Sequence, residues 1–197
     1  MNPRAGVPDN PPPFDELRVL RSERIYASPW CGLRRDVLEL PDGAEQEYHV
    51  VEIPDAAAVV PLTPGGRIVL VGQYRHPHGK THWEVPAGRI HAGEDPRACA
   101  SREVREETGY ELARLVSLPG FYAAGGISAH WAHLYVGEGC VRVGEPALDG
   151  CERLVVREFS RAEVERLLDA GRIEDGFSAL ALLYWLRATT RSPGPAS

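Results

Sequence analysis

The sequence predicts an α+β protein in which a strand-rich N-terminal part precedes a larger sheet with helices. Three observations support this prediction. Residues 18–53 alternate apolar and polar side chains between turn signals, as short strands do. Residues 56–62 form a continuous apolar run typical of a buried strand. Residues 96–108 have the sequence features of a capped helix.

The composition indicates one domain, or one domain with a small addition, in a chain of 197 residues. Net charge is −6 and the basic residues are dispersed, so nothing favours a nucleic acid as the main partner. The four cysteines form no paired motif and are expected to be reduced thiols. No apolar run approaches 18 residues, and prolines stand where a signal peptide would be apolar. We therefore expect a soluble, cytoplasmic protein without a membrane partner.

The N-terminal part is expected to contain a tail and then strands. Residues 1–16 hold five prolines by position 13 and little to bury, which predicts a disordered tail. Residues 36–40 and 48–53 read as strands, and the turn signal Pro41-Asp42-Gly43 lies between them.

The larger part is expected to alternate strands with a few helices. Residues 56–62 and 67–74 are predicted to form a hairpin around Thr63-Pro64-Gly65-Gly66. Ser160-Arg161-Ala162-Glu163 is a capping box that opens a helix ending at Gly171. Strands are also expected at 112–118, 131–136 and 153–159, with a mobile loop at 137–152. Residues 175–178 are expected to break the chain between the two helices, the second of which is apolar and spans 179–187. A loose tail is expected at 192–197.

The most informative stretch runs from Gly88 to Tyr110. Asp95 can cap a helix, Pro96 suits its first turn, and Gly109 can end it in the left-handed conformation. On that helix three glutamates are spaced i, i+3, i+4 and share one face: Glu103, Glu106 and Glu107. Their mutual repulsion would be offset by a hard divalent cation such as Mg²⁺, which takes oxygen ligands. Alternatively, the three glutamates form a solvated acidic helix face.

The fixed positions around this helix resemble the Nudix box. They are Gly88, Glu94, Arg102, Glu103, Glu106, Glu107 and Gly109. At ordinary residue frequencies these seven coincide by chance at about 10⁻⁸ per starting point. The chain is therefore identified as a member of the Nudix hydrolase family, whose box spans residues 88–110 here.

The resemblance extends to the ADP-ribose pyrophosphatase-like subfamily, through Gln73-Tyr74-Arg75 and the strands before residue 55. It implies a Nudix fold, a mixed β-sheet between helices, over residues 55–191. It also implies that residues 17–54 form a small antiparallel sheet that takes part in a homodimer.

The resemblance implies a site as well. Metal ions, Mg²⁺ or alternatively Mn²⁺, would be held by the carbonyl of Ala87 and by Glu103, Glu106 and Glu107. Glu106 either completes that set or hydrogen-bonds to it. The implied catalytic set is Glu152, Glu106 and Arg102, with Glu152 as general base, although Glu152 could instead be a solvated loop residue.

For several positions, a purely structural role or an exposed loop position is the alternative to a role in the site. Arg102 and Glu94 can form a structural ion pair that locks the loop to the helix. Arg75 is implied as a substrate contact, together with Glu84, or it pairs with a core carboxylate. The subfamily usually has Ser-Pro-Gly and then an acidic residue, where this chain has 124–126 and His130. His130 is a substrate contact or an exposed loop residue.

The expected reaction is attack of water on phosphorus in a nucleoside diphosphate linked to another moiety, giving two monophosphates. ADP-ribose or a related nucleotide sugar is the expected substrate. The alternatives are GDP-mannose, another nucleotide sugar or a dinucleotide, and a Nudix-fold regulator that binds nucleotides without hydrolysis. Because all box carboxylates are present, the enzyme is favoured.

Overall fold

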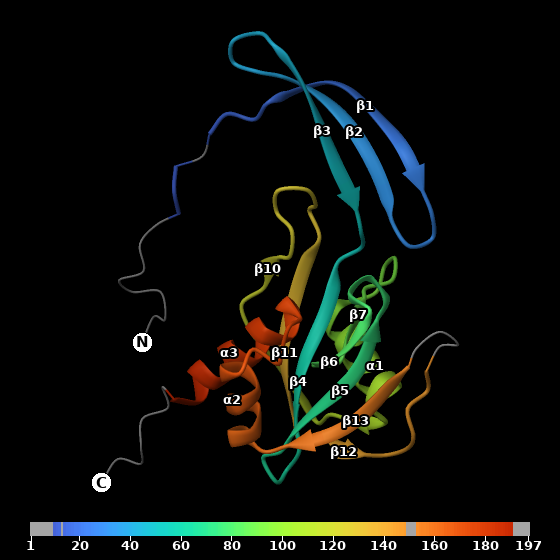
Figure 1. The fold of residues 1–197 in the computed structure, drawn as a ribbon, viewed down its shortest axis with the longest axis vertical. Helices are drawn as coiled ribbons and strands as arrows, with labels where there is room; N and C mark the ends of the chain where they lie inside the picture. The colour runs from blue at the N-terminus through green and yellow to red at the C-terminus, as the bar shows by residue number, and fades with distance from the viewer. Residues whose placement is uncertain (1–9, 13, 149–152, 191–197) are drawn as a thin grey trace. The chain divides into compact units, whose positions relative to one another are not determined.

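The computed structural model describes residues 10–12, 14–148 and 153–190, and the chain divides into two compact units (Figure 1). The first unit spans Met1–Val51 and the second Glu52–Ser197. Among the described residues, no helix is long and apolar enough to cross a membrane. Three of the four cysteines are described, and all three are free thiols.

The first unit is an antiparallel sheet of β1 (Arg18–Ala27), β2 (Gly32–Glu39) and β3 (Glu45–Glu52), in that order. The turn before β3 is made by Asp42 and Gly43, since Gly43 has φ +82° and Asp42 accepts a hydrogen bond from the Ala44 N–H. Asp36 is buried and accepts hydrogen bonds from Ser22 and Arg34, which lower the pKa of its carboxyl group. The predicted small N-terminal sheet is confirmed.

The second unit is built on a mixed eight-stranded sheet with the central order β10-β11-β4-β5-β13. β11 runs parallel to β4, and the other pairings are antiparallel. Its strands are β4 (Ala56–Leu62), β5 (Ile68–Arg75), β6 (Lys80–Glu84), β7 (Ala87–Arg89), β9 (Arg114–Ser117), β10 (Phe121–Tyr122), β11 (Trp131–Glu138) and β13 (Leu154–Phe159). A separate pair joins β8 (Tyr110–Glu111) to β12 (Val141–Arg142).

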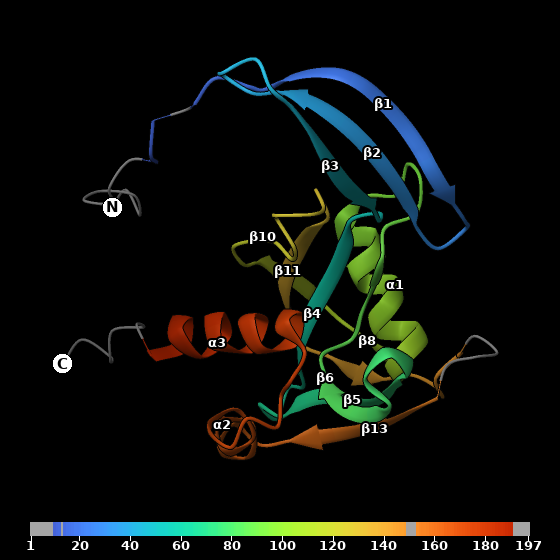
Figure 2. The same cartoon turned by 45° about the horizontal axis from the view of Figure 1, so that its top comes forward.

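Helices cover both faces of this sheet, as Figure 2 shows. Ala58 and Val60 of β4 pack in one core, with Leu182 and Trp185 of α3 (Gly176–Thr190) and Val164 of α2 (Arg161–Asp169). Alternate residues of the same strand, Ala57 and Val59, pack in a second core with Cys99, Ala100 and Val104 of α1 (Pro96–Thr108). Because successive side chains of a strand point to opposite faces, the two cores lie on opposite sides of the sheet. The predicted α+β class, with a mixed sheet between helices, is confirmed.

Two predicted elements differ from the structure. β4 and β5 pair only at Leu62 and Ile68 beside their turn, because β7 takes the edge of β4 and β6 takes the edge of β5. The predicted loop 137–152 contains the end of β11 and all of β12, which pairs with β8.

The predicted break between the two helices at residues 175–178 is also wrong. The helix already begins at Gly176, since Asp175 accepts hydrogen bonds from the N–H and hydroxyl of Ser178. An Asp one residue before a helix satisfies backbone donors of the first turn, so it starts the helix earlier than hydropathy suggests.

Candidate functional site

The helix that carries the glutamates begins and ends at the residues predicted from the sequence. The Asp95 carboxylate accepts hydrogen bonds from the backbone N–H groups of Arg97 and Ala98, at 2.8 and 3.2 Å. Gly109 ends the helix with φ +72°, and its N–H donates to the carbonyl of Arg105. These caps fix where the helix begins and ends, and the helix period then places the three glutamates on one face.

Two of the three glutamates are buried. Glu103 is 9% exposed and Glu107 only 4%. The backbone N–H of Ala87 donates to Glu107 Oε2 at 3.1 Å, which joins β7 directly to the helix. Glu106 is more exposed and accepts a hydrogen bond from Arg102 at 3.0 Å. A buried carboxylate is costly unless it is paired, and the Ala87 N–H and Arg102 supply partners here.

Gly88 makes close approach of the carboxylate possible. A Cβ placed on Gly88 would lie 2.0 Å from Glu103 Oε1, well inside van der Waals contact. Only glycine lets the β7 backbone pass this close to the glutamate.

Arg102 connects the glutamates to the preceding loop. Its guanidinium donates to Glu94 at 2.8 and 3.0 Å, to Glu103 at 2.6 Å and to Glu106 at 3.0 Å. The Arg102 hydrogen bonds lower the pKa of Glu94 to about 2, and Glu94 in turn raises the pKa of Arg102. The ion pair that the sequence offered as an alternative is present in the structure.

The Arg102 network also includes groups that sequence reasoning missed. The guanidinium donates to the carbonyl of Arg89 at 3.1 Å and lies 3.4 Å from the sulfur of Cys99. Burial raises the pKa of the Cys99 thiol to about 12, so it stays neutral. A backbone carbonyl carries no sequence signal, because every residue type has one.

The donor set suits a hard divalent cation, although the side chains are not gathered around one point. Among the described residues, no three His, Cys, Asp or Glu side chains are arranged to hold a metal ion. Arg102 explains part of this, because it binds both Glu103 and Glu106. The buried carboxylates of Glu103 and Glu107 beside the Gly88 backbone are nevertheless oxygen donors of the kind that Mg²⁺ takes.

Arg75 and Glu84 form a partly buried ion pair on neighbouring strands. Arg75 Nη2 lies 2.6 Å from Glu84 Oε2, and Glu84 is 2% exposed. Burial lowers the pKa of Arg75, but the hydrogen bonds to Glu84 outweigh this and leave the pKa raised. Arg75 therefore pairs with a core carboxylate, the second of its two predicted environments, while about two-fifths of its side chain faces solvent.

His130 is anchored and partly buried. A ring nitrogen lies 2.6 Å from the carbonyl of Pro54, and the ring lies 5.6 Å from that of Phe177. This hydrogen bond ties the loop 123–130 to the start of β4. The prediction of an exposed loop residue is therefore only partly right.

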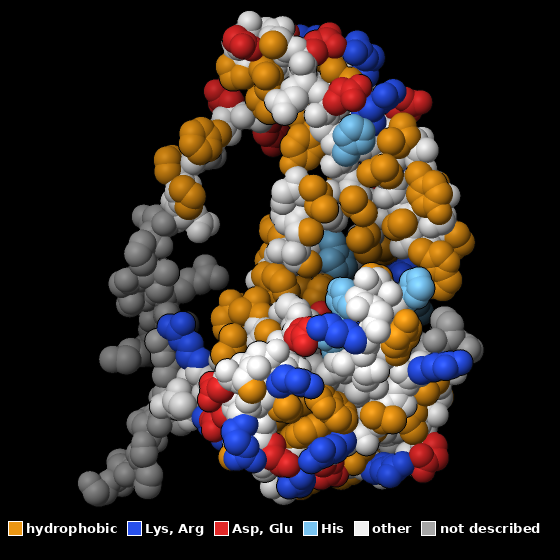
Figure 3. Space-filling view, in the orientation of Figure 1, with side chains coloured by type: hydrophobic (Ala, Val, Ile, Leu, Met, Phe, Trp, Pro, Cys, Tyr) orange, Lys and Arg blue, Asp and Glu red, His pale blue; other side chains and the backbone are white. Residues whose placement is uncertain are grey.

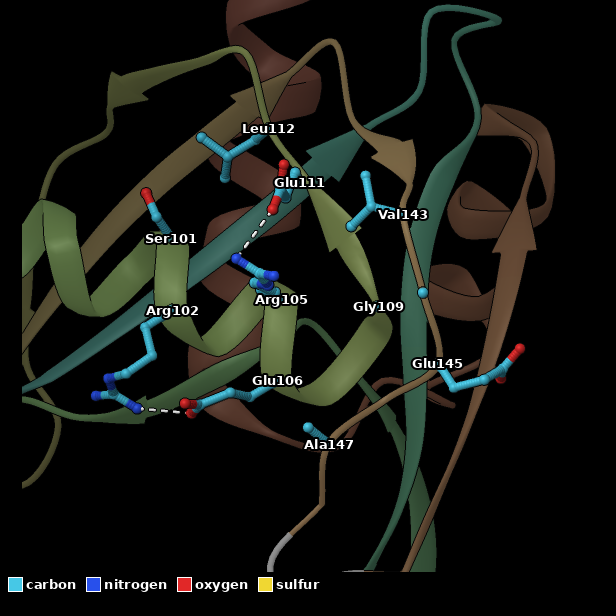
Figure 4. Close-up of a pocket in the computed structure, with 11 residues that line it drawn as sticks. Ser101, Arg102, Arg105, Glu106, Gly109, Glu111, Leu112, Val143, Glu145 and Ala147 are labelled. Carbon is cyan, nitrogen blue, oxygen red and sulfur yellow. Dashed lines mark hydrogen bonds and ion pairs between the residues drawn. The ribbon is translucent and has the colours of Figure 1, made fainter.

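A pocket of about 790 Å³ lies along the outer face of α1, between the helix and residues 143–147 (Figure 4). Arg102, Arg105 and Glu106 line its helix side, and Glu145 lies on the opposite side. The Ala147 N–H donates to the carbonyl of Glu106 at 2.8 Å, which holds the segment against the helix. Glu152, the predicted base, lies outside the described residues.

The fold and the Gly88–Gly109 arrangement define a Nudix protein, and the chain belongs to the Nudix family, whose domain matches residues 52–180. It is a Nudix pyrophosphohydrolase. Residues 18–51 match a second family, described as the nucleoside diphosphate sugar hydrolase N-terminal domain.

Individual relatives cover most of the chain. It is 31% identical to the ADP-ribose pyrophosphatase of Bacillus subtilis over 170 residues, which are 86% of this chain and 92% of the relative. The methanol dehydrogenase activator of Bacillus methanolicus is 35% identical over the same shares. The ADP-ribose pyrophosphatase of Mycobacterium tuberculosis is 32% identical over 89% of this chain and 86% of its own length.

A solved structure, described as an ADP compounds hydrolase, matches with a TM-score of 0.77 at 20% identity, over 92% of this chain and all of the other. At that identity the match establishes the fold, and the predicted Nudix fold is confirmed.

Proposed function

We propose that this enzyme hydrolyses the pyrophosphate bond of a nucleoside diphosphate linked to a sugar, with ADP-ribose as the best candidate, and releases two monophosphates. The observation that carries the proposal is the pair of buried carboxylates, Glu103 and Glu107, against the bare backbone of Gly88. The names of the relatives support the substrate class, since two are ADP-ribose pyrophosphatases.

The proposal includes a divalent cation, Mg²⁺ or Mn²⁺, held by Glu103, Glu106, Glu107 and the carbonyl of Ala87. When bound, such a cation neutralises diphosphate charge and lowers the pKa of a water molecule. Glu107 is already oriented toward β7 by the Ala87 N–H, and Arg102 holds Glu103 and Glu106. Cation binding then requires Arg102 to release part of its contact with these two glutamates, while its bonds to Glu94 keep it in place.

Arg75 is the proposed phosphate contact. Its guanidinium is partly exposed and is held by Glu84, so it can offer its remaining N–H donors to an anion without losing its position. Glu84 is then the residue that orients Arg75.

Glu152 remains the proposed general base. Glu152→Gln keeps the size of the side chain but cannot take a proton, so kcat should fall at least about 100-fold with little change in KM. The measurement is steady-state kinetics with Mg²⁺ and ADP-ribose. Glu165→Gln, at the surface of α2, is the control and should change kcat less than about twofold. A similarly small effect of Glu152→Gln would reject the assignment.

A substrate panel tests the function itself. The full-length protein is incubated with Mg²⁺ and with ADP-ribose, GDP-mannose, another nucleotide sugar or a dinucleotide, and products are separated by chromatography. The proposal expects AMP and ribose 5-phosphate from ADP-ribose, and no products from the Glu103→Gln/Glu107→Gln double variant. A higher kcat/KM for GDP-mannose or a dinucleotide would make that compound the substrate in place of ADP-ribose. If none of the compounds is hydrolysed, the proposal is wrong.

A non-hydrolytic regulator is the second candidate, since one relative is named as an activator of methanol dehydrogenase. The complete set of box glutamates, two of which are buried, favours hydrolysis instead. The substrate panel separates the two, because a regulator would bind nucleotides without forming products.

We also propose that the protein is a cytoplasmic homodimer and that β1–β3 take part in the interface. Most side chains of these strands are exposed, and they include the apolar Val19, Ile25 and Tyr26. Figure 3 shows hydrophobic side chains among charged ones on this unit. A three-stranded sheet with so little buried apolar surface is expected to need further contacts. Cell fractionation, which should place the protein in the cytoplasmic fraction, tests the proposed location.

A further inference from the structure

Two histidines meet on the hairpin formed by β5 and β6, and neither has a role in the proposed hydrolysis. His78 Nδ1 lies 3.0 Å from His82 Nε2. The ring centroids are 5.0 Å apart and the ring planes meet at 81°, so the rings contact through their edges. His78 lies on the exposed turn after β5, whereas His82 on β6 is 5% exposed.

The second nitrogen of His82 faces a carboxylate. His82 Nδ1 lies 3.7 Å from Glu174 Oε2, and Glu174 also forms an ion pair with Lys80. A histidine that binds a metal through one nitrogen commonly presents its other nitrogen to a carboxylate, which fixes the ring and its tautomer.

We propose that this hairpin carries a second metal site, in which His78 Nδ1 and His82 Nε2 bind a transition-metal ion of the Zn²⁺ class and Glu174 orients His82. Zinc–imidazole bonds of about 2.0–2.1 Å at a tetrahedral angle place the two nitrogens about 3.3 Å apart, close to the distance in the structure. Among the described residues no three His, Cys, Asp or Glu side chains are arranged to hold a metal, so the proposed site has two protein ligands and would take its other ligands from solvent.

The proposed site differs in chemistry from the glutamate face of α1. Its donors are imidazole nitrogens, which suit Zn²⁺, Ni²⁺ and Cu²⁺, whereas the glutamates are oxygen donors that suit Mg²⁺. The two sites can therefore be filled independently, and this inference does not depend on the proposed substrate.

A bound ion would also join the two sides of the hairpin. His78 follows Arg75 by three residues, and His82 precedes Glu84 by two. Bridging His78 to His82 would hold the turn against β6 and reduce local opening of the hairpin that carries the Arg75–Glu84 pair.

Calorimetric titration with Zn²⁺ tests the site on the full-length protein in saturating Mg²⁺, which occupies oxygen sites. The wild type should bind Zn²⁺ at this hairpin, and His78→Gln should weaken that binding at least about tenfold, since even an outer partner of a metal ligand is typically worth 10–100-fold. Glu174→Gln should weaken it by about tenfold. His76→Gln is the matched control in the same exposed turn and should bind as the wild type does.

X-ray absorption at the zinc edge provides the second readout and should show two imidazole ligands in the wild type and one in His78→Gln. His78 is exposed, so this variant is expected to fold even if a change at buried His82 does not. Absence of Zn²⁺ binding by the wild type, equal binding by His78→Gln, or equal loss in His76→Gln would each overturn the proposal. In the first case the two rings share a hydrogen bond only.

Discussion

Single residues decide how the glutamate face of α1 is built. Glu103 and Glu107 are buried, although burying an ionised carboxylate costs several kcal/mol if it is not compensated. Arg102 and the Ala87 N–H supply part of the compensation. Apolar residues would pack at these positions without this desolvation cost, so the presence of two glutamates supports the proposed cation site.

Glu103→Gln and Glu107→Gln should each lower kcat by roughly 100-fold or more, because each removes a negative charge from the proposed cation site. The helix should survive, since glutamine and glutamate have similar helix propensities. Glu165→Gln is the control, as Glu165 lies in α2 and forms an ion pair with Arg161 at the surface. Turnover within twofold of wild type in either site variant would remove that residue from the metal site.

Gly88→Ala should impair the site more than the fold. The added Cβ would lie 2.0 Å from Glu103 Oε1, and the end of a flexible side chain can move away. The carboxylate would then leave its position, so we expect a higher Mg²⁺ requirement and a lower kcat with a small change in Tm. Gly176→Ala is the control, because nothing lies within 4 Å of its added Cβ. An unchanged Mg²⁺ dependence in Gly88→Ala would show that this close approach is unimportant.

At the scale of elements, α1 is held in place by contacts at both of its ends. Asp95 caps its first turn, Gly109 ends it, and the Gly109 backbone packs so closely that an added Cβ would lie 2.3 Å from the carbonyl oxygen of Gly144. The helix therefore has fixed ends on both sides of the glutamates. This rigidity suits a site in which small displacements of the ligands are costly.

Asp95→Ala should destabilise the protein by about 1 kcal/mol, because the N–H groups of Arg97 and Ala98 lose their acceptor. The free energy of unfolding in urea measures the effect. Asp169→Ala, at the exposed last residue of α2, should stay within about 0.5 kcal/mol of wild type. Equal stability of Asp95→Ala and wild type would mean that water replaces the cap without cost.

At the scale of the whole molecule, the chain combines two units with different degrees of burial. The second unit has a core on each face of its sheet, whereas the first unit buries few side chains. A match to a separate N-terminal family over residues 18–51 agrees with this division. The first unit is therefore the part of the chain that most needs contacts beyond its own strands.

Deleting residues 1–53 should expose apolar surface and abolish the proposed dimer, whereas deleting residues 1–16 should leave size and activity unchanged. Light scattering after gel filtration gives the mass of each form. The shorter deletion serves as the control for loss of the N-terminus itself. A monomer mass for the full-length chain would reject the dimer.

The sequence by itself determined α1, its caps and the family. Asp95, Pro96 and Gly109 act through local backbone hydrogen bonds and dihedral angles, so their effect can be read from neighbouring residues. The helix period places Glu103, Glu106 and Glu107 on one face, and the continuous apolar run 56–62 predicts a buried strand. These signals are local, and the structure agrees with them.

Only the tertiary structure decided the partners of those residues. β4 and β5 diverge because β6 and β7 compete for their edges, and such competition between distant strands leaves no local signal. Arg75 pairs with Glu84 because β5 and β6 are neighbours in the sheet, whereas Arg102 reaches the Arg89 carbonyl from α1 and His78 reaches His82 from the turn before β6. Contacts between side chains depend on register and direction in space, which the order of residues alone does not specify.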